Sequence, residues 1–183
     1  DVAFEKDDYG TLLVQEKLWP LEIASYRRLD VTGFCAWACL FHETKEVKER
    51  LARADVKALA HAQRPLAVLC HTYRTDYFAA DEIAIELSMH NDTRQDRALE
   101  LVCEYVKGKE VIWRESWPKA VFAPAESKAF TSRCRAPQVE KETALAFRVT
   151  LKADGKVADR WEKPLRVFPR AAGVALPAGF VVY

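Results

Sequence analysis

Alternation of apolar and polar side chains between residues 82 and 151 is the feature that most constrains this fold. A two-residue period places every second side chain on the same face of a strand, and an apolar face paired with a polar one indicates a half-buried strand. The apolar positions are Ile83, Ile85, Leu87 and Met89, then Leu99, Leu101, Cys103 and Tyr105, then Leu145, Phe147, Val149 and Leu151. These stretches predict antiparallel sheets with one buried face.

Turn sequences separate the predicted strands. Lys107-Gly108-Lys109 predicts a hairpin into a strand at 111–113, and Asp154-Gly155 predicts a second hairpin from 145–151 into 157–161. A strand at 129–134 follows a loop at 122–127, and a closing strand is expected at 165–169. About seven short strands over roughly a hundred residues predict an immunoglobulin-like antiparallel β-sandwich at 63–170, which makes the chain mainly β.

The first 62 residues follow a different pattern. A short strand is expected at 11–15, a helix from Pro20 to Arg28, an apolar strand buried on both faces at 34–41 and a helix within 44–62. This order is that of an α/β segment, and it supplies too few strands for a complete parallel sheet. Residues 171–183 read as a linker and the start of a further element, so we divide the chain into 1–62, 63–170 and 171–183.

Composition excludes several classes of partner. The formal net charge of the 183 residues is +1, without a long run of like charge, so no nucleic-acid partner is expected. No stretch approaches the roughly 20 apolar residues of a membrane span, so we expect a soluble chain without a membrane partner. The sequence begins without Met or a signal peptide, and we expect a piece of a larger protein.

The cysteines and histidines show no ligand spacing. The five cysteines lack CxxC pairs and are expected to be small buried residues, which fits a reducing cytoplasm better than secretion. The glycosylation pattern Asn91-Asp92-Thr93 would matter only in a secretory compartment. The four histidines form no HExxH pattern, and GxSxG, phosphate-loop and Rossmann patterns are missing from the sequence. We therefore expect neither a metal nor a cofactor.

Three stretches of the chain resemble a known family. Residues 62–68, 75–83 and 90–93, and the final hairpin from Leu151 through Asp154-Gly155 to Trp161 and Pro169, resemble the immunoglobulin-like sandwich that follows the catalytic barrel in glycoside hydrolase family 2. That group comprises β-galactosidases, β-mannosidases and β-glucuronidases. Upstream, residues 26–37 resemble the last strand of the family's TIM barrel, and 44–62 its last helix.

The resemblance implies a role for Glu16, which from its own surroundings is equally an ordinary surface carboxylate at a strand end. If residues 11–15 are the seventh barrel strand, Glu16 matches the nucleophile of a retaining glycosidase, with Trp37 and Trp19 beside the carbohydrate substrate of the parent enzyme. Retaining hydrolysis needs a second carboxyl roughly 5 to 5.5 Å away, from a barrel strand that this chain lacks. We therefore expect this chain alone to be inactive, with the sandwich as a structural accessory domain.

A second hypothesis is a stand-alone, non-catalytic sandwich that binds carbohydrate or protein. Trp113, Trp117 and Trp161 would then form an aromatic platform, whereas core packing is the other reading of these residues. The enzyme-fragment hypothesis predicts an exposed apolar surface on residues 11–60, where missing strands would pack, and self-association through it. The module hypothesis predicts that those residues cover the sandwich.

Overall fold

The computed structural model describes residues 8–29, 31 and 54–170. Within these residues, two helices, α1 (Asp8–Arg28) and α3 (Ala54–Ala62), precede the strands. The strands are β1 (Leu66–Cys70), β2 (Asp76–Phe78), β3 (Glu82–Asn91), β4 (Arg97–Lys107), β5 (Glu110–Phe122), β6 (Glu126–Arg135), β7 (Thr143–Ala153) and β8 (Lys156–Phe168).

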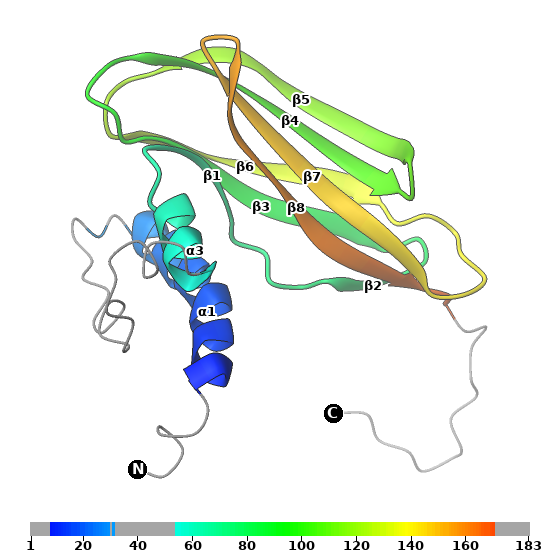
Figure 1. Ribbon diagram of the computed structural model, residues 1–183. Coiled ribbons are helices and arrows are strands. Elements are labelled where there is room, and N and C mark those ends of the chain that lie inside the picture. Colours follow the sequence, from blue (N-terminus) through cyan, green and yellow to red (C-terminus); the bar gives the residue numbers. More distant parts are fainter. Residues whose placement is uncertain (1–7, 30, 32–53, 171–183) are drawn as a thin grey trace.

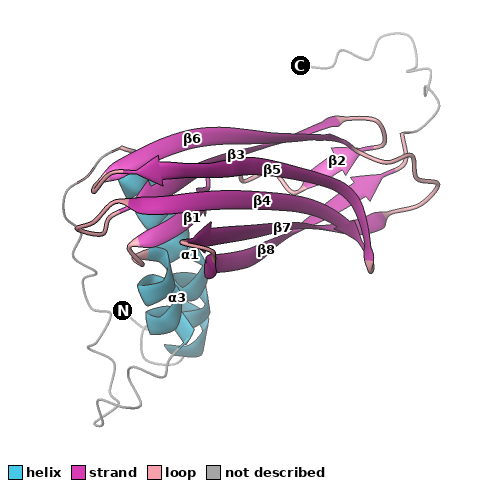
Figure 2. Cartoon of the chain, turned by 90° about the horizontal axis from the view of Figure 1, so that it is seen from above, coloured by secondary structure: helices cyan, strands magenta, loops and turns pink. Residues whose placement is uncertain are grey.

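The strands form two facing sheets, as Figures 1 and 2 show. One sheet has three strands in the order β1-β3-β6, and the other has five in the order β2-β8-β7-β4-β5. All neighbours pair antiparallel except β2, which runs parallel to the end of β8. The expected mainly β fold with antiparallel sheets is confirmed.

The closing part of the sandwich differs in detail from the prediction. The strands expected at 157–161 and 165–169 form one long strand, β8, with Pro164 in its interior. Proline is tolerated in strands where its missing N–H faces no partner. Pro164 pairs with Ala146 on one side, while β2 covers the other side of β8 only at residues 166–168. Strands β1 and β2 are additions to the expected set.

Both expected hairpins are present. Asp154 and Gly155, between β7 and β8, both have positive φ, at 51° and 81°. A two-residue turn of type I′ needs positive φ at both central positions, which explains the Asp-Gly pair. Gly108 opens the turn between β4 and β5 at a φ of 62°. The loop expected at 122–127 shortens to 123–125, because β5 continues to Phe122 and β6 begins at Glu126.

The core lies between the sheets and contains the alternating apolar residues. Tyr105 of β4 packs on Phe147 of β7 with ring centroids 4.8 Å apart, and both are fully buried. The thiols of Cys103 and Cys134 are free and buried, and burial raises the pKa of both. A buried thiol with a raised pKa is unreactive, so these cysteines act as small apolar residues, as expected.

Side chains from the wider sheet close one open edge of the narrower sheet. Asp159 of β8 accepts a hydrogen bond from the Val68 backbone N–H of β1 at 3.0 Å, and the Trp161 indole donates to the Val68 carbonyl at 2.9 Å. The Asp159 oxygen that binds Val68 also forms an ion pair with Arg64. A buried strand edge needs such partners, since an unpaired backbone group there costs free energy.

The opposite edge is closed in the same manner. Trp117 of β5 packs edge-on against Phe130 of β6, with ring centroids 5.4 Å apart. Two residues earlier in β5, the Glu115 carboxylate accepts a 3.4 Å hydrogen bond from the Arg133 backbone N–H of β6. An acid and a tryptophan at i and i+2 therefore contact each free edge of the three-stranded sheet.

The strand expected at 11–15 is wrong, because these residues belong to helix α1. A short apolar run such as Leu12-Leu13-Val14 does not distinguish a strand from a buried helix, and the following Gln, Glu and Lys are good helix formers. Pro20, expected in a first helical turn, lies inside α1. Its missing N–H leaves the Glu16 carbonyl without the usual i to i−4 partner.

The two helices pack side by side next to β1 (Figure 1). Ala24 of α1 forms a buried cluster with Ala67 and Leu69 on the outer face of β1. Small side chains let the helix approach the sheet closely. Helix α3 falls within the helix expected at 44–62, while the strand expected at 34–41 lies outside the described residues.

Replacing Asp159 should destabilise the sandwich strongly. In Asp159→Ala the Val68 N–H loses its acceptor and Arg64 keeps a largely buried charge without its partner. We expect a loss of about 3 kcal/mol in the free energy of unfolding, measured by urea denaturation. Glu162 lies three residues after Asp159 in β8 and forms an exposed ion pair with Arg148. Glu162→Ala should therefore lower the free energy of unfolding by less than about 1 kcal/mol. Equal losses would contradict a closing role for Asp159.

Candidate functional site

The structure separates the residues that the sequence grouped as a candidate sugar site. Glu16 is half-buried in the middle of α1 and does not follow a strand, so the geometric argument for a nucleophile at a strand end no longer applies to it. Trp19, one turn further along α1, is buried, which suits packing better than stacking on a substrate. Trp37 lies outside the described residues.

The three sandwich tryptophans do not form a common platform. Trp117 packs on Phe130, and Trp161 contacts Phe147 with ring centroids 6.1 Å apart, so both are half-buried at the edges of the core. Trp113 is different, since it is 48% exposed. Two of the three therefore follow the packing interpretation.

Arg27 makes the main polar connection between helix α1 and the sandwich. Its Nη1 donates to the carbonyls of Ala62 at 2.9 Å and Arg64 at 3.3 Å, at the junction of α3 and β1. Its Nη2 forms a 2.7 Å ion pair with Asp92, just after β3. One guanidinium thus connects three segments that are far apart in the sequence.

A hydrogen-bonded chain of two histidines and a serine lies next to Arg27. Ser88 Oγ is 2.7 Å from His71 Nε2 and 2.7 Å from His90 Nε2. Ser88 and His90 share the outer face of β3, and His71 follows β1. They line a groove of about 310 Å³ on the outer face of the three-stranded sheet, with Arg27 and Arg28 of α1 as one wall.

Burial controls the charge of these histidines. It lowers the pKa of His90, which is only 4% exposed, to about 4, and the nearby Arg27 charge acts in the same direction. Burial also lowers the pKa of His71. Both imidazoles are therefore neutral at pH 7. Among the described residues no carboxylate hydrogen-bonds either ring, so the third group of a nucleophilic triad is not seen there.

Sequence reasoning did not identify this groove. The alternation of β3 places Glu86, Ser88 and His90 opposite the apolar face, and that signal was readable. The contribution of His71 depends on the pairing of β1 with β3, and that of Arg27 on the position of α1. Neither contact has a local signature in the sequence.

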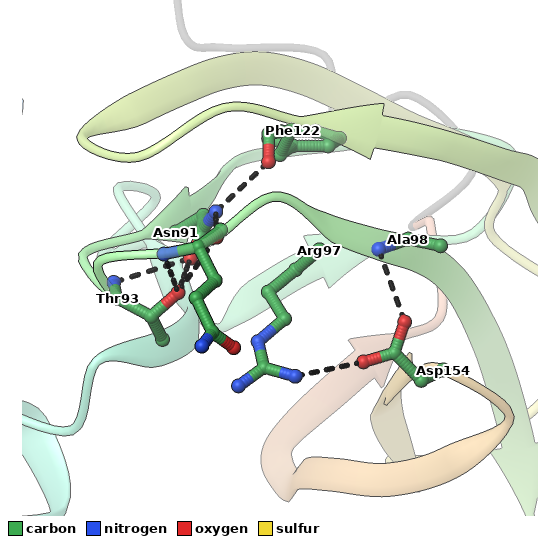
Figure 3. A network of polar contacts seen from close by, with 7 residues as sticks. Asn91, Thr93, Arg97, Ala98, Phe122 and Asp154 are labelled. Atoms are coloured by element: carbon green, nitrogen blue, oxygen red, sulfur yellow. Dashed lines mark hydrogen bonds and ion pairs between the residues drawn. The ribbon is translucent and has the colours of Figure 1, made fainter.

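The glycosylation pattern at Asn91 has a structural explanation. Asn91 is fully buried, and its amide nitrogen donates to the carbonyls of Gln95, Phe122 and Ala123 at 2.8 to 3.0 Å. Its oxygen accepts from the Thr93 backbone N–H and hydroxyl, as Figure 3 shows. In the same view, the Asp154 carboxylate accepts hydrogen bonds from the Arg97 guanidinium and from the Ala98 backbone N–H. The Asn-x-Thr spacing thus belongs to a turn in which the Asn91 and Thr93 side chains hydrogen-bond to each other and to nearby backbone groups.

Within residues 8–29, 31 and 54–170, no group of three or more His, Cys, Asp or Glu side chains is placed to hold a metal ion. In the same part of the chain, neither helix has the length and apolar character needed to cross a bilayer.

Comparison with known proteins gives a limited result. No protein-family model matches the sequence, and no curated protein is significantly similar to it. Among solved structures, the chain is similar to a β-glucuronidase from glycoside hydrolase family 2, with 17% sequence identity and a TM-score of 0.40. The match covers 55% of this chain and 11% of that chain.

The neutral His90 predicts a pH dependence of stability. Between pH 6.5 and about 4 the unfolded chain binds a proton that folded His90 does not bind, so acidification through this window favours unfolding. From pH 7 to pH 4 we expect His90 to account for a loss of about 3 kcal/mol, measured by urea denaturation at each pH. His90→Gln should remove that part of the pH dependence. Partial burial also lowers the pKa of His61, but His61 is much more exposed than His90, so His61→Gln should retain most of the pH dependence. An unchanged slope in His90→Gln would contradict the prediction.

Proposed function

We propose that this chain is a piece of a retaining glycoside hydrolase of the β-galactosidase, β-mannosidase and β-glucuronidase type. In this proposal the sandwich is a structural accessory domain that braces the neighbouring part of the enzyme. The stretches 62–68, 75–83 and 90–93 and the hairpin from Leu151 to Pro169, which resemble the sandwich of that family, fall in β1 to β3, at the end of β7 and in β8. They support an accessory role because they form the framework to which α1 and α3 are attached.

One observation carries the proposal: α1 is fixed to the sandwich on one side and exposes apolar side chains elsewhere. Arg27 and Ala24 hold the helix against the sheet. In the same segment Leu18 is 48%, Leu29 73% and Val31 46% exposed. Exposed apolar side chains gathered on one segment are typical of a surface that a partner covers. A bracing domain needs an element that contacts the sandwich on one side and the neighbouring part of the enzyme on the other, and α1 would be that element.

The chemistry of the parent enzyme remains part of the proposal. A retaining glycosidase uses two carboxyl groups roughly 5 to 5.5 Å apart, one as nucleophile and one as acid. On the family resemblance alone, Glu16 is our candidate for one of them, with Trp19 and Trp37 as candidates for contacts with the sugar. The second carboxyl would come from a part of the enzyme that this chain does not contain.

A stand-alone module that binds carbohydrate is the second candidate function. The exposed Trp113 favours it, since the other two tryptophans of the sandwich have ring partners.

Weakening the Arg27 connection should release α1 while the sandwich survives. We expect thermolysin, which cleaves beside apolar residues, to cut α1 of Arg27→Ala at least about tenfold faster than in the unaltered chain, since about 1.4 kcal/mol of lost local stability gives that factor. A core from about Gln63 to Pro169 should persist, with its ends read by mass spectrometry.

Arg28→Ala is the matched control for this experiment. Arg28 is the next residue of α1, and among the described residues its side chain forms only an exposed ion pair with Glu86 at 3.4 Å, so its loss should leave the cleavage rate unchanged. Simultaneous loss of residues 63–169 in Arg27→Ala would mean that helices and sandwich fold as one unit, which contradicts an accessory role.

The chain by itself should not hydrolyse glycosides. We expect no turnover of aryl β-galactosides, β-mannosides or β-glucuronides above that of buffer, since one candidate carboxylate cannot replace a pair. Turnover that disappears in Glu16→Gln would show that the chain is itself a catalyst, and the accessory proposal would then be wrong.

A further inference from the structure

A cleft beside β5 is not explained by a bracing role. The five-stranded sheet is wider than its partner, and β5 is its edge strand. Within the described residues β5 does not pair with β6, and side chains of β5 make the contacts between the two strands. The cleft has a volume of about 540 Å³ and is lined by Glu82, Ile112, Trp113, Arg133, Cys134, Arg135 and Pro137. Sites for small molecules typically measure roughly 300 to 1,000 Å³.

Trp113 is the aromatic wall of this cleft. It pairs across the strands with Tyr105, which is fully buried, so both side chains leave the sheet on its inner face. Glu115 and Trp117 follow on the same face and contact β6, whereas Trp113 has no aromatic partner within the described residues. A tryptophan that is 48% exposed in a cleft presents a large apolar surface to a ligand.

Charged groups form the rim of the cleft. Arg133 and Glu82 form an ion pair, and their side chains are 61% and 60% exposed. The guanidinium only donates hydrogen bonds and the carboxylate only accepts them. Arg135 adds further donors, and it forms no ion pair with any residue that the structure describes. A flat apolar surface therefore lies beside donors and acceptors that solvent can reach.

We propose that this cleft binds a short saccharide, an inference that rests on the second candidate function and gives it a site. The apolar C–H face of one pyranose ring would stack on the Trp113 indole, and neighbouring hydroxyls of that ring would donate to Glu82 and accept from Arg133. Sugars have this combination of one apolar face and a rim of groups that both donate and accept. The site is built entirely from the sandwich and involves neither Glu16 nor the groove beside α1.

The test is a titration of the full 183-residue chain with short β-linked gluco-, manno- and galacto-oligosaccharides, followed by the indole N–H signals in NMR spectra. We expect at least one saccharide to shift the Trp113 signal saturably while the Trp161 signal, whose N–H is bonded to Val68, stays in place. Trp113→Ala should weaken binding at least tenfold. Trp113→Tyr keeps an aromatic face and should retain most of the affinity, which covers the case in which the alanine variant does not fold.

Arg133 and Arg114 supply a matched pair of variants. They are 61% and 62% exposed and each forms an ion pair with a glutamate, but only Arg133 lines the cleft. Arg133→Ala should lower the affinity several-fold, and Arg114→Ala should leave it unchanged.

Three results would overturn the proposal: no shift of the Trp113 signal with any saccharide, equal losses in the two arginine variants, or a Trp113 signal that moves on dilution of the protein alone. The last result would identify the cleft as a contact between two copies of the chain. None of these variants touches Arg27, so failure here is separate from failure of the bracing role.

Discussion

The buried carboxylate of Asp159 is the interaction on which the relation between the two sheets and the helical segment depends. One of its oxygens accepts from the Val68 N–H and pairs with Arg64, so β8, β1 and the end of α3 meet at a single atom. The Arg64 carbonyl in turn accepts from Arg27 of α1. A charge taken out of water is tolerated only with such partners, and here each partner belongs to a different element.

The unequal width of the sheets explains why these side chains are needed. In this sandwich a three-stranded sheet faces a five-stranded one. The two edge strands of the narrow sheet, β1 and β6, lie beside the wider sheet but form no backbone ladder with it. An acid followed two residues later by a tryptophan contacts each edge, from β8 on one side and β5 on the other. The acid serves an N–H group, and the large ring fills the gap between the layers.

The sandwich could be predicted from sequence because its signals are local. Alternation in β3, β4 and β7 shows which face is buried, and Asp154-Gly155 has the turn chemistry that its hairpin requires. The second half of helix α1 was expected as a helix from Pro20 to Arg28, whereas its first half was expected as a strand, because three apolar residues near its start suit a strand equally well. The groove and the cleft depend on contacts across sheets, and no spacing in the sequence encodes that His71 reaches Ser88 or that Trp113 lies beside Arg133.

The burial of Asn91 sets the order of two events for any chain of this sequence that meets a glycosyltransferase. The amide nitrogen that would receive a glycan is the donor that holds the ends of β3 and β5 together. Once folded, the side chain is out of reach of the enzyme. A glycan attached earlier would lie where the Phe122 and Ala123 carbonyls approach the amide nitrogen, and that end of the sandwich could not close. Folding and modification at this asparagine are therefore mutually exclusive, and the faster process determines the outcome.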